Sequence, residues 1–175
     1  MIHLSDYSAQ QIIEELNLQR LAVEGTYYKN TYVGELNEDQ SPIATAMIGL
    51  YATSPLSNSI FHKLEHDEIW HHYAGSPIDL HLIHPDGRYE KVMLGASINN
   101  VQFVVPKNVW QAGEVSVTGD WGLFGCTMAP GFTGSAFTAA SRSELLKLAP
   151  EQRNVIERLT LPESHDKSMP EGFKQ

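Results

Sequence analysis

The feature that most constrains the fold is a succession of short β-rich segments between residues 26 and 128, without an amphipathic helix between them. The segments that predict strands are 26–33, 43–51, 59–64, 68–73, 78–83, 88–94, 101–105 and 122–128. Parallel strands need long crossovers, usually helices, whereas antiparallel strands can be joined by turns. The sequence therefore predicts an all-β fold, an antiparallel sandwich or barrel, and excludes a doubly wound sheet.

Helical signals flank this region. Ser8 and Gln11 have the spacing of a capping box, with apolar residues following at helical intervals, so we expect a helix over residues 8 to 17. Ser141 and Glu144 predict a second capping box, and Pro150 is suited to the first turn of a further helix.

We expect one domain over residues 1–175. Its core covers about 20–135, a helical extension about 141–160, and a poorly ordered polar tail 162–175.

The charge of the chain restricts its partners. The formal net charge is -9, with 21 acidic and 12 basic residues, and nucleic acid or an anionic membrane surface needs a clustered basic face instead. The start of the sequence lacks a secretory pattern, and nowhere do 18 apolar residues stand together, so a cytoplasmic location is expected. The single cysteine, Cys126, is expected to be a small buried residue on a strand.

Histidines concentrate in one segment. The six that fall between residues 62 and 84 are His62, His66, His71, His72, His81 and His84. Imidazoles and carboxylates transfer protons and bind metals, so this segment is the candidate site. Residues 62–66 also spell H-x-x-E-H, a zinc-peptidase pattern, but that pattern needs a helix and the segment shows no apolar helical stripe.

A strand-turn-strand interpretation accounts for the segment better. Because side chains alternate across a strand, Glu68, Trp70 and His72 share one face, and His71 points away from it. A carboxylate on an inward face must find partners or raise its pKa, and His62 and His72 are the partners available to Glu68.

The same residues resemble the first motif of the cupin superfamily. His62 stands for its first histidine, Leu64 for its second, Glu68 for its glutamate and Gly75 for its glycine.

The second cupin motif is matched at Pro106, whereas Asn108 replaces its glycine and Gln111 replaces its histidine. Two of the four metal ligands that the superfamily commonly uses are thus replaced, by Leu64 and Gln111.

A longer signature resembles one family of small cupins, similar in fold to deoxysugar-nucleotide epimerases and of undefined function. It consists of Glu24-Gly25, Thr31-Tyr32, Phe61-His62-Lys63, Asp67-Glu68-Ile69-Trp70-His71, His84-Pro85-Asp86-Gly87, Val104-Val105-Pro106, Gly125-Cys126-Thr127 and Ala129-Pro130-Gly131-Phe132. The resemblance implies a jelly-roll barrel and a homodimer. It implies no particular reaction.

Three hypotheses for function follow. In the first, the chain is a metal-independent isomerase or epimerase of a small, carbohydrate-like substrate, with Glu68 and His62 as catalytic acid and base and with Trp70, His72 and Gln111 binding the ligand. No cofactor is expected in this case. The second is a non-catalytic ligand binder or sensor. The third is a metal-dependent enzyme with a weakly bound divalent ion held by His62, Glu68 and Gln111.

For each of these residues except Glu68, a purely structural role in the barrel interior is an equal alternative. His66 and His84 lie beside predicted turns and are expected on the surface, and the side on which His81 lies is left open.

Overall fold

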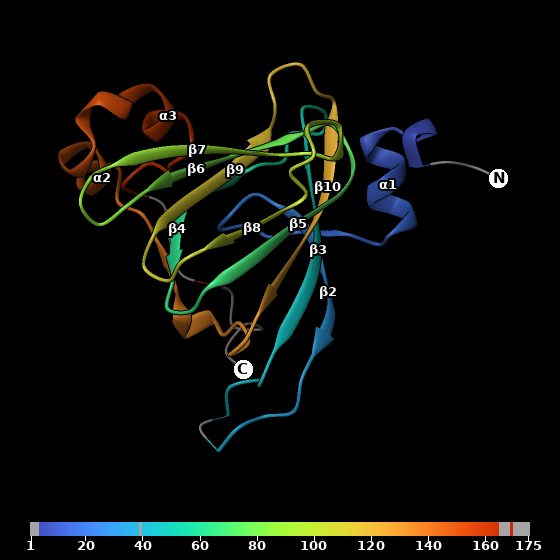
Figure 1. The fold of residues 1–175 in the computed structure, drawn as a ribbon, viewed down its shortest axis with the longest axis horizontal. Helices are drawn as coiled ribbons and strands as arrows, with labels where there is room; N and C mark the ends of the chain where they lie inside the picture. Colours follow the sequence, from blue (N-terminus) through green and yellow to red (C-terminus); the bar gives the residue numbers. More distant parts are fainter. Residues whose placement is uncertain (1–3, 39, 165–168, 170–175) are drawn as a thin grey trace.

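Two antiparallel sheets face each other and form a barrel (Figure 1). The computed structural model describes residues 4–38, 40–164 and 169. The first sheet has the order β1-β2-β3-β10-β5-β8 and the second the order β11-β4-β9-β6-β7. The strands are β1 (Gln19–Arg20), β2 (Tyr27–Val33), β3 (Thr45–Ala52), β4 (Ser59–Leu64), β5 (Glu68–Gly75), β6 (Ile78–Ile83), β7 (Tyr89–Leu94), β8 (Gln102–Val105), β9 (Trp110–Val115), β10 (Trp121–Met128) and β11 (Phe137–Ala139).

The main core lies between the two sheets. Alternation along β6 places Leu80 and Leu82, both fully buried, on the inner face, where they pack with Tyr51 and Phe124 from the opposite sheet. The rings of Tyr51 and Phe124 have centroids 4.4 Å apart. The interior at this level is thus filled by side chains.

The eight predicted strands are all present, and the strands predicted at 59–64 and 78–83 have those same ends. Sequence reasoning missed β1, β9 and β11. Strand β9 was missed because alanine and glycine at its centre weaken the strand pattern, although β9 pairs with both β4 and β6. Gly113 is required there, since a Cβ atom would lie 2.5 Å from the Tyr51 ring.

The predicted turn at Pro85-Asp86-Gly87 joins β6 and β7 into a hairpin. The His84 amide donates to the Arg88 carbonyl, and Gly87 has a φ of 85°, a left-handed conformation that favours glycine.

The helices are α1 (Ala9–Glu15), α2 (Arg142–Leu148) and α3 (Arg153–Arg158), with short 3-10 turns at Leu4–Asp6, Ala96–Ile98, Gly134–Ala136 and Pro150–Gln152. Helix α1 begins with the predicted capping box of Ser8 and Gln11. The second capping box was predicted wrongly, because the Ser141 hydroxyl bonds to Ser143 and to Glu163 instead of capping α2.

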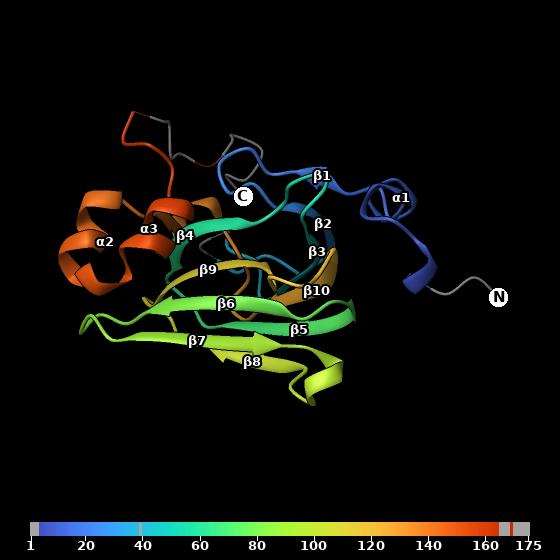
Figure 2. The ribbon, with the colours of Figure 1, turned by 90° about the horizontal axis from the view of Figure 1, so that it is seen from above.

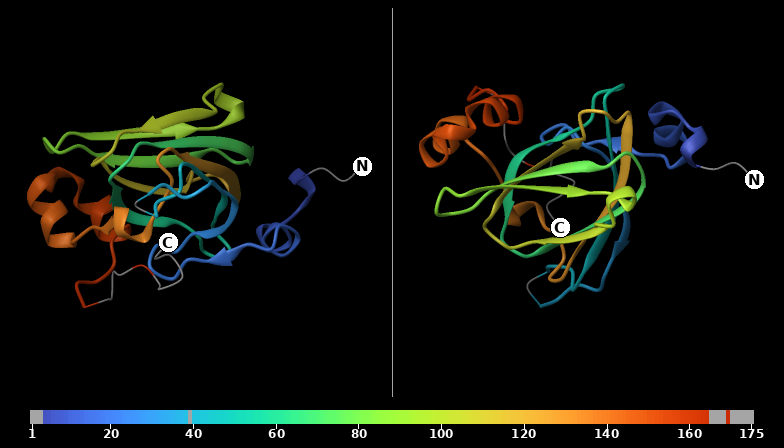
Figure 3. Two further views of the ribbon diagram at one scale, coloured as in Figure 1. Left: turned by 90° about the horizontal axis from the view of Figure 1, so that it is seen from below. Right: turned by 45° about the horizontal axis from the view of Figure 1, so that its top comes forward.

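The helices cover the barrel on opposite sides, α1 against the first sheet and α2 with α3 beside the second (Figures 2 and 3). On the outer face of β6, His81 is buried and bonds to the Tyr89 hydroxyl at 2.8 Å and to Glu114 at 3.0 Å. Arg158 of α3 also binds Glu114. His81 therefore belongs to the contact between sheet and helices and is remote from the barrel interior.

Most of the predicted poorly ordered tail, residues 165–168 and 170–175, lies outside the described residues. Among the described helices, none has the length and apolar character needed to cross a membrane.

Candidate functional site

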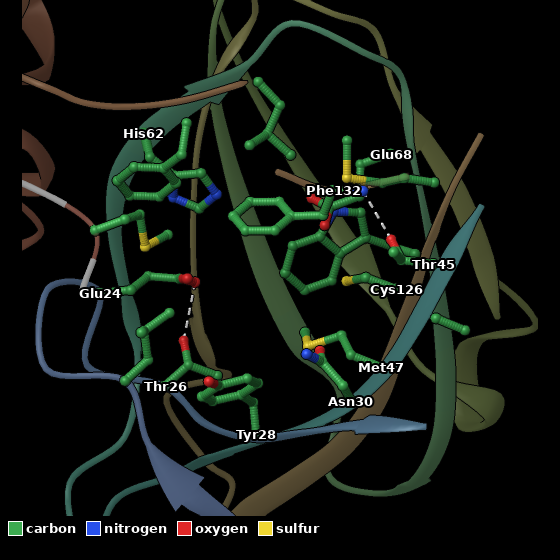
Figure 4. Close-up of a pocket in the computed structure, with 17 residues that line it drawn as sticks. Glu24, Thr26, Tyr28, Asn30, Thr45, Met47, His62, Glu68, Cys126 and Phe132 are labelled. Carbon is green, nitrogen blue, oxygen red and sulfur yellow. Dashed lines mark hydrogen bonds between the residues drawn. The ribbon is translucent and has the colours of Figure 1, made fainter. Parts of the chain in front are cut away.

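A pocket lies between the sheets at one end of the barrel (Figure 4). Its volume of about 70 Å³ has room for several water molecules or a small organic molecule. The polar or ionisable residues that line it are Glu24, Thr26, Tyr28, Asn30, Thr45, His62, Glu68 and Cys126. The apolar residues are Leu21, Ala46, Met47, Leu64, Trp70, Met128, Phe132, Phe137 and Met169. The pocket thus combines an apolar wall with a few converging polar groups, as small-molecule sites do.

Glu68 is the most deeply placed acid of the pocket. It opens β5 and is only 8% exposed. Gln111 donates from Nε2 to Glu68 Oε2 at 2.8 Å, and the buried Cys126 thiol lines the same pocket. Burial raises the pKa of Glu68; the neighbouring His62 imidazole opposes this rise, and the negative charge of Glu24 adds to it. The carboxyl is therefore predisposed to hold a proton more readily than an exposed glutamate.

His62 faces the same pocket from the other sheet, on β4. It is 4% exposed, and its ring stacks on Phe137 with centroids 5.0 Å apart. Nδ1 lies 2.8 Å from the Ile60 carbonyl oxygen, which can only accept, so Nδ1 must carry the hydrogen. In the neutral ring, Nε2 then keeps the lone pair.

Trp70 lies beside Glu68 on the inner face of β5, as predicted, and lines the pocket. Its ring stacks on the Phe124 ring with centroids 4.8 Å apart. Its Nε1 donates to Gln111 Oε1 at 3.0 Å. The indole nitrogen is thus already used inside the protein.

Gln111 and His72 were both predicted to bind ligand, but neither lines the pocket. Gln111 lies behind it, 1% exposed, with both ends of its amide bonded to Trp70 and Glu68. His72 is on the inner face of β5 but further along the barrel, where Nε2 donates to the Ser76 carbonyl at 3.0 Å. Its Nδ1 is buried without a hydrogen-bond partner.

The donor set does not fit a metal held by three or four protein ligands. Leu64 lines the pocket where the predicted motif would place a histidine, and the Gln111 oxygen accepts from Trp70. In the part of the chain that the structure describes, His, Cys, Asp and Glu form no group of three or more that could hold an ion. Only His62 and Glu68 of the predicted ligands face the pocket.

Sequence reasoning missed the polar residues that β2 and the preceding loop bring to the pocket: Glu24, Thr26, Tyr28 and Asn30. Glu24 is held there by backbone pairing, because the Ile60 amide donates to its carbonyl at 3.1 Å. The alternation of Thr26, Tyr28 and Asn30 was visible in the sequence and could have indicated one shared face.

Comparison with known proteins identifies the family. The family model described as Cupin superfamily (DUF985) matches residues 10–140. The chain belongs to the cupin superfamily. A protein of known structure from Shewanella oneidensis shares 30% sequence identity, covering 90% of this chain and 99% of that one, with a TM-score of 0.81. No curated protein matches the chain at a significant level.

Two further solved structures are similar to this cupin. A hypothetical protein from Leishmania major is 25% identical over 89% of this chain and 100% of that chain, with a TM-score of 0.78. A cupin 2 domain-containing protein from Halorhodospira halophila, 12% identical over 80% of this chain and 86% of that chain, has a TM-score of 0.52 and supports the fold alone.

Each of the two cupin motifs has one position that commonly holds glycine, occupied here by Gly75 in the first motif and by Asn108 in the second. Asn108 has a φ of 64°, so it adopts the left-handed conformation for which the motif uses glycine. Gly75 has a φ of 82°, and a Cβ there would lie 2.4 Å from the Trp121 ring. Both positions at which the motifs have glycine thus adopt a positive φ in this chain.

Proposed function

We propose that this cupin is a metal-independent isomerase or epimerase that transfers protons on a small polar carbonyl compound bound in the pocket. The observation that carries the proposal is the pairing of two buried groups from opposite sheets. His62 has Nε2 as its lone-pair nitrogen, and Glu68 has a raised pKa. A base and an acid held apart in one cavity are what proton transfer beside a carbonyl requires.

In the reaction, His62 Nε2 takes the proton from the carbon next to the carbonyl group. The electron pair of that C–H bond forms the C=C bond of an enediol, and protonated Glu68 gives its proton to the carbonyl oxygen. The carbonyl group re-forms when the Glu68 carboxylate takes a hydroxyl proton back from the enediol while a carbon atom is protonated. Transfer of the His62 proton to the neighbouring carbon, with loss of the other hydroxyl proton to Glu68, gives an isomer. Protonation of the original carbon on its opposite face by water, with the His62 proton released to solvent, gives an epimer. No redox partner is needed.

The surrounding residues support this assignment of roles. The hydrogen bond from Gln111 holds the Glu68 carboxyl in position. The side chains of Thr26, Tyr28 and Asn30 offer partners to substrate hydroxyls. Trp70 and Phe137 provide apolar surface for the carbon face of a sugar.

Deuterium exchange tests the proposal directly. The protein is incubated in D₂O with small aldoses, ketoses and their derivatives, and NMR follows loss of the proton next to the carbonyl group. The wild type should catalyse exchange, and Glu68→Gln and His62→Asn should each slow it by about 100-fold or more while the fold is kept. Binding without exchange would instead favour the non-catalytic binder.

A further inference from the structure

The charges that face the pocket do not balance. Two acids, Glu24 and Glu68, line it, of which Glu68 is protonated in the proposed reaction, and neither a lysine nor an arginine is among the described lining residues. The ion pairs formed by described residues involve neither carboxylate. His62 is therefore the one basic side chain among these lining residues.

Glu24 is fixed in this position by its surroundings. Its carbonyl accepts from the Ile60 amide, and its Oε1 accepts from the Thr26 hydroxyl at 3.0 Å. Gly25, with a φ of 97°, completes the turn in which its amide donates to the Leu21 carbonyl. Figure 4 shows Glu24 and Glu68 entering the pocket from different sides.

The field of Glu24 reaches across the pocket. Burial is the main cause of the raised pKa values of Tyr28, Glu68 and Cys126, and the charge of Glu24 raises all three further. These residues lie on β2, β5 and β10. The charge of Glu24 thus acts on side chains from three different strands around the pocket.

The remaining wall also suits a cation. Aromatic rings of Tyr28, Trp70, Phe132 and Phe137 line the pocket, and the face of such a ring attracts an ammonium group. A phosphate or carboxylate would be repelled by the Glu24 carboxylate, and a neutral sugar would leave the Glu24 charge without a counterpart.

We propose that the substrate carries a protonated amine, which binds against the Glu24 carboxylate. This inference rests on the proposed function, because it names the substrate class of the same site. An amino sugar or a smaller amino alcohol with a carbonyl group would place its ammonium group at Glu24 and its reacting carbon between His62 and Glu68.

Methionine methyl groups give a direct measure of binding. With ¹³C-methyl methionine labelling, Met47, Met128 and Met169 report from the pocket wall, and Met93 on β7 is an internal reference away from it. The probes are matched pairs: 2-amino-1,3-propanediol against glycerol, and glucosamine against glucose and N-acetylglucosamine.

The wild type should bind each amine about tenfold or more tightly than its neutral counterpart, with shifts at the three pocket methyls. Glu24→Gln keeps an acceptor for Thr26 and removes the charge, so the ratio should fall to about one. Glu35→Gln removes the same charge from an exposed residue outside the pocket and should leave the ratio unchanged. A ratio near one in the wild type, a ratio unaffected by Glu24→Gln, or no pocket shift with either amine at its highest usable concentration would overturn the inference.

The exchange experiment separates this inference from the proposed function. If amines bind in a Glu24-dependent way but no amino carbonyl compound undergoes exchange, the proposed ligand class is supported and the proposed enzymatic activity is refuted. If exchange depends on Glu68 but occurs only on neutral sugars, with no preference for amines, the enzymatic activity is supported and the amine substrate is refuted.

Discussion

Gln111 on β9 and Glu68 on β5 are joined across the barrel by a hydrogen bond of 2.8 Å. The same amide accepts from Trp70, so one side chain links the acid of the pocket, the indole beside it and the opposite sheet. Gln111 stands at a cupin ligand position and links the Trp70 indole to the Glu68 carboxyl through its two hydrogen bonds.

Gln111→Leu should therefore affect both stability and the acid. It leaves the Trp70 nitrogen and one Glu68 oxygen without their partner, and we expect the free energy of unfolding to fall by about 1–3 kcal/mol. It also removes a hydrogen bond that lowers the pKa of Glu68, so the pH profile of deuterium exchange should move to higher pH. Chemical denaturation and exchange rates across pH measure the two effects. Gln102→Leu, at an exposed position, is the control, and equal losses in both variants would contradict the assigned role.

Glu68→Gln should change how stability depends on pH. Burial raises the pKa of Glu68 above the ordinary 4.5, so below that pH the carboxyl is protonated in both folded and unfolded chains. As pH rises above 4.5 the unfolded chain releases the proton first, and the wild type loses stability until pH passes the folded pKa. The stability of Glu68→Gln relative to wild type should accordingly increase with pH, by at most about 1.4 kcal/mol per pH unit.

Denaturation of both proteins between about pH 4 and pH 8 measures this difference. Glu90 and Glu114, whose pKa values are lowered by hydrogen bonds and charged neighbours, give the opposite trend, but they are present in both proteins and cancel. A difference that stays flat across this range would show that the folded protein does not raise the pKa of Glu68.

Metal content should be well below one equivalent in protein purified without metal-affinity resin. The physical reason is the donor set, since only His62 and Glu68 of the predicted ligands face the pocket. Elemental analysis of wild type, His62→Ala and Glu68→Gln checks this. A stoichiometric metal in the wild type that is lost in both variants would establish a metal site instead.

A homodimer also stays a prediction, and the sheet edges indicate where it can form. Strand β1 pairs only with Tyr27 and Tyr28, so β2 from Lys29 onward lacks a partner on that side among the described strands. Val33 there is 48% exposed. Unpaired apolar edges favour association with another strand.

Light scattering at micromolar concentration should give twice the mass of one chain. Val33→Lys should yield a monomer if β2 is the contact, and Val104→Lys, at the edge strand β8, tests the other edge of the same sheet. A monomeric wild type would refute the prediction.

Short-range patterns predicted most of the fold. Turn residues, alternation and the capping box at Ser8 gave all strands but β1, β9 and β11 and gave α1, because these signals are local. Strand β9 was not predicted, because Gly113 at its centre is required by the close approach of Tyr51, a residue distant in sequence.

The candidate site was predictable to the extent that it lies on one strand pair. His62, Glu68 and Trp70 converge on the pocket because alternation fixes their faces. Glu24 comes from a loop that only tertiary pairing with Ile60 brings near. His72 shares the inner face of β5 but lies further along the barrel than the pocket. Alternation predicts the face of a side chain and not its position along the barrel axis.

The family match ends at residue 140, yet α2 and α3 follow it and cover the outer face of the second sheet. Phe61, Ile83 and Trp110 of that sheet are buried together with Leu145 and Ile156 of these helices. A chain cut at the family boundary would expose this apolar surface to solvent, and such a fragment should aggregate when expressed alone. We therefore expect the portion that folds by itself to be longer than the matched region and to include α2 and α3 through Leu159.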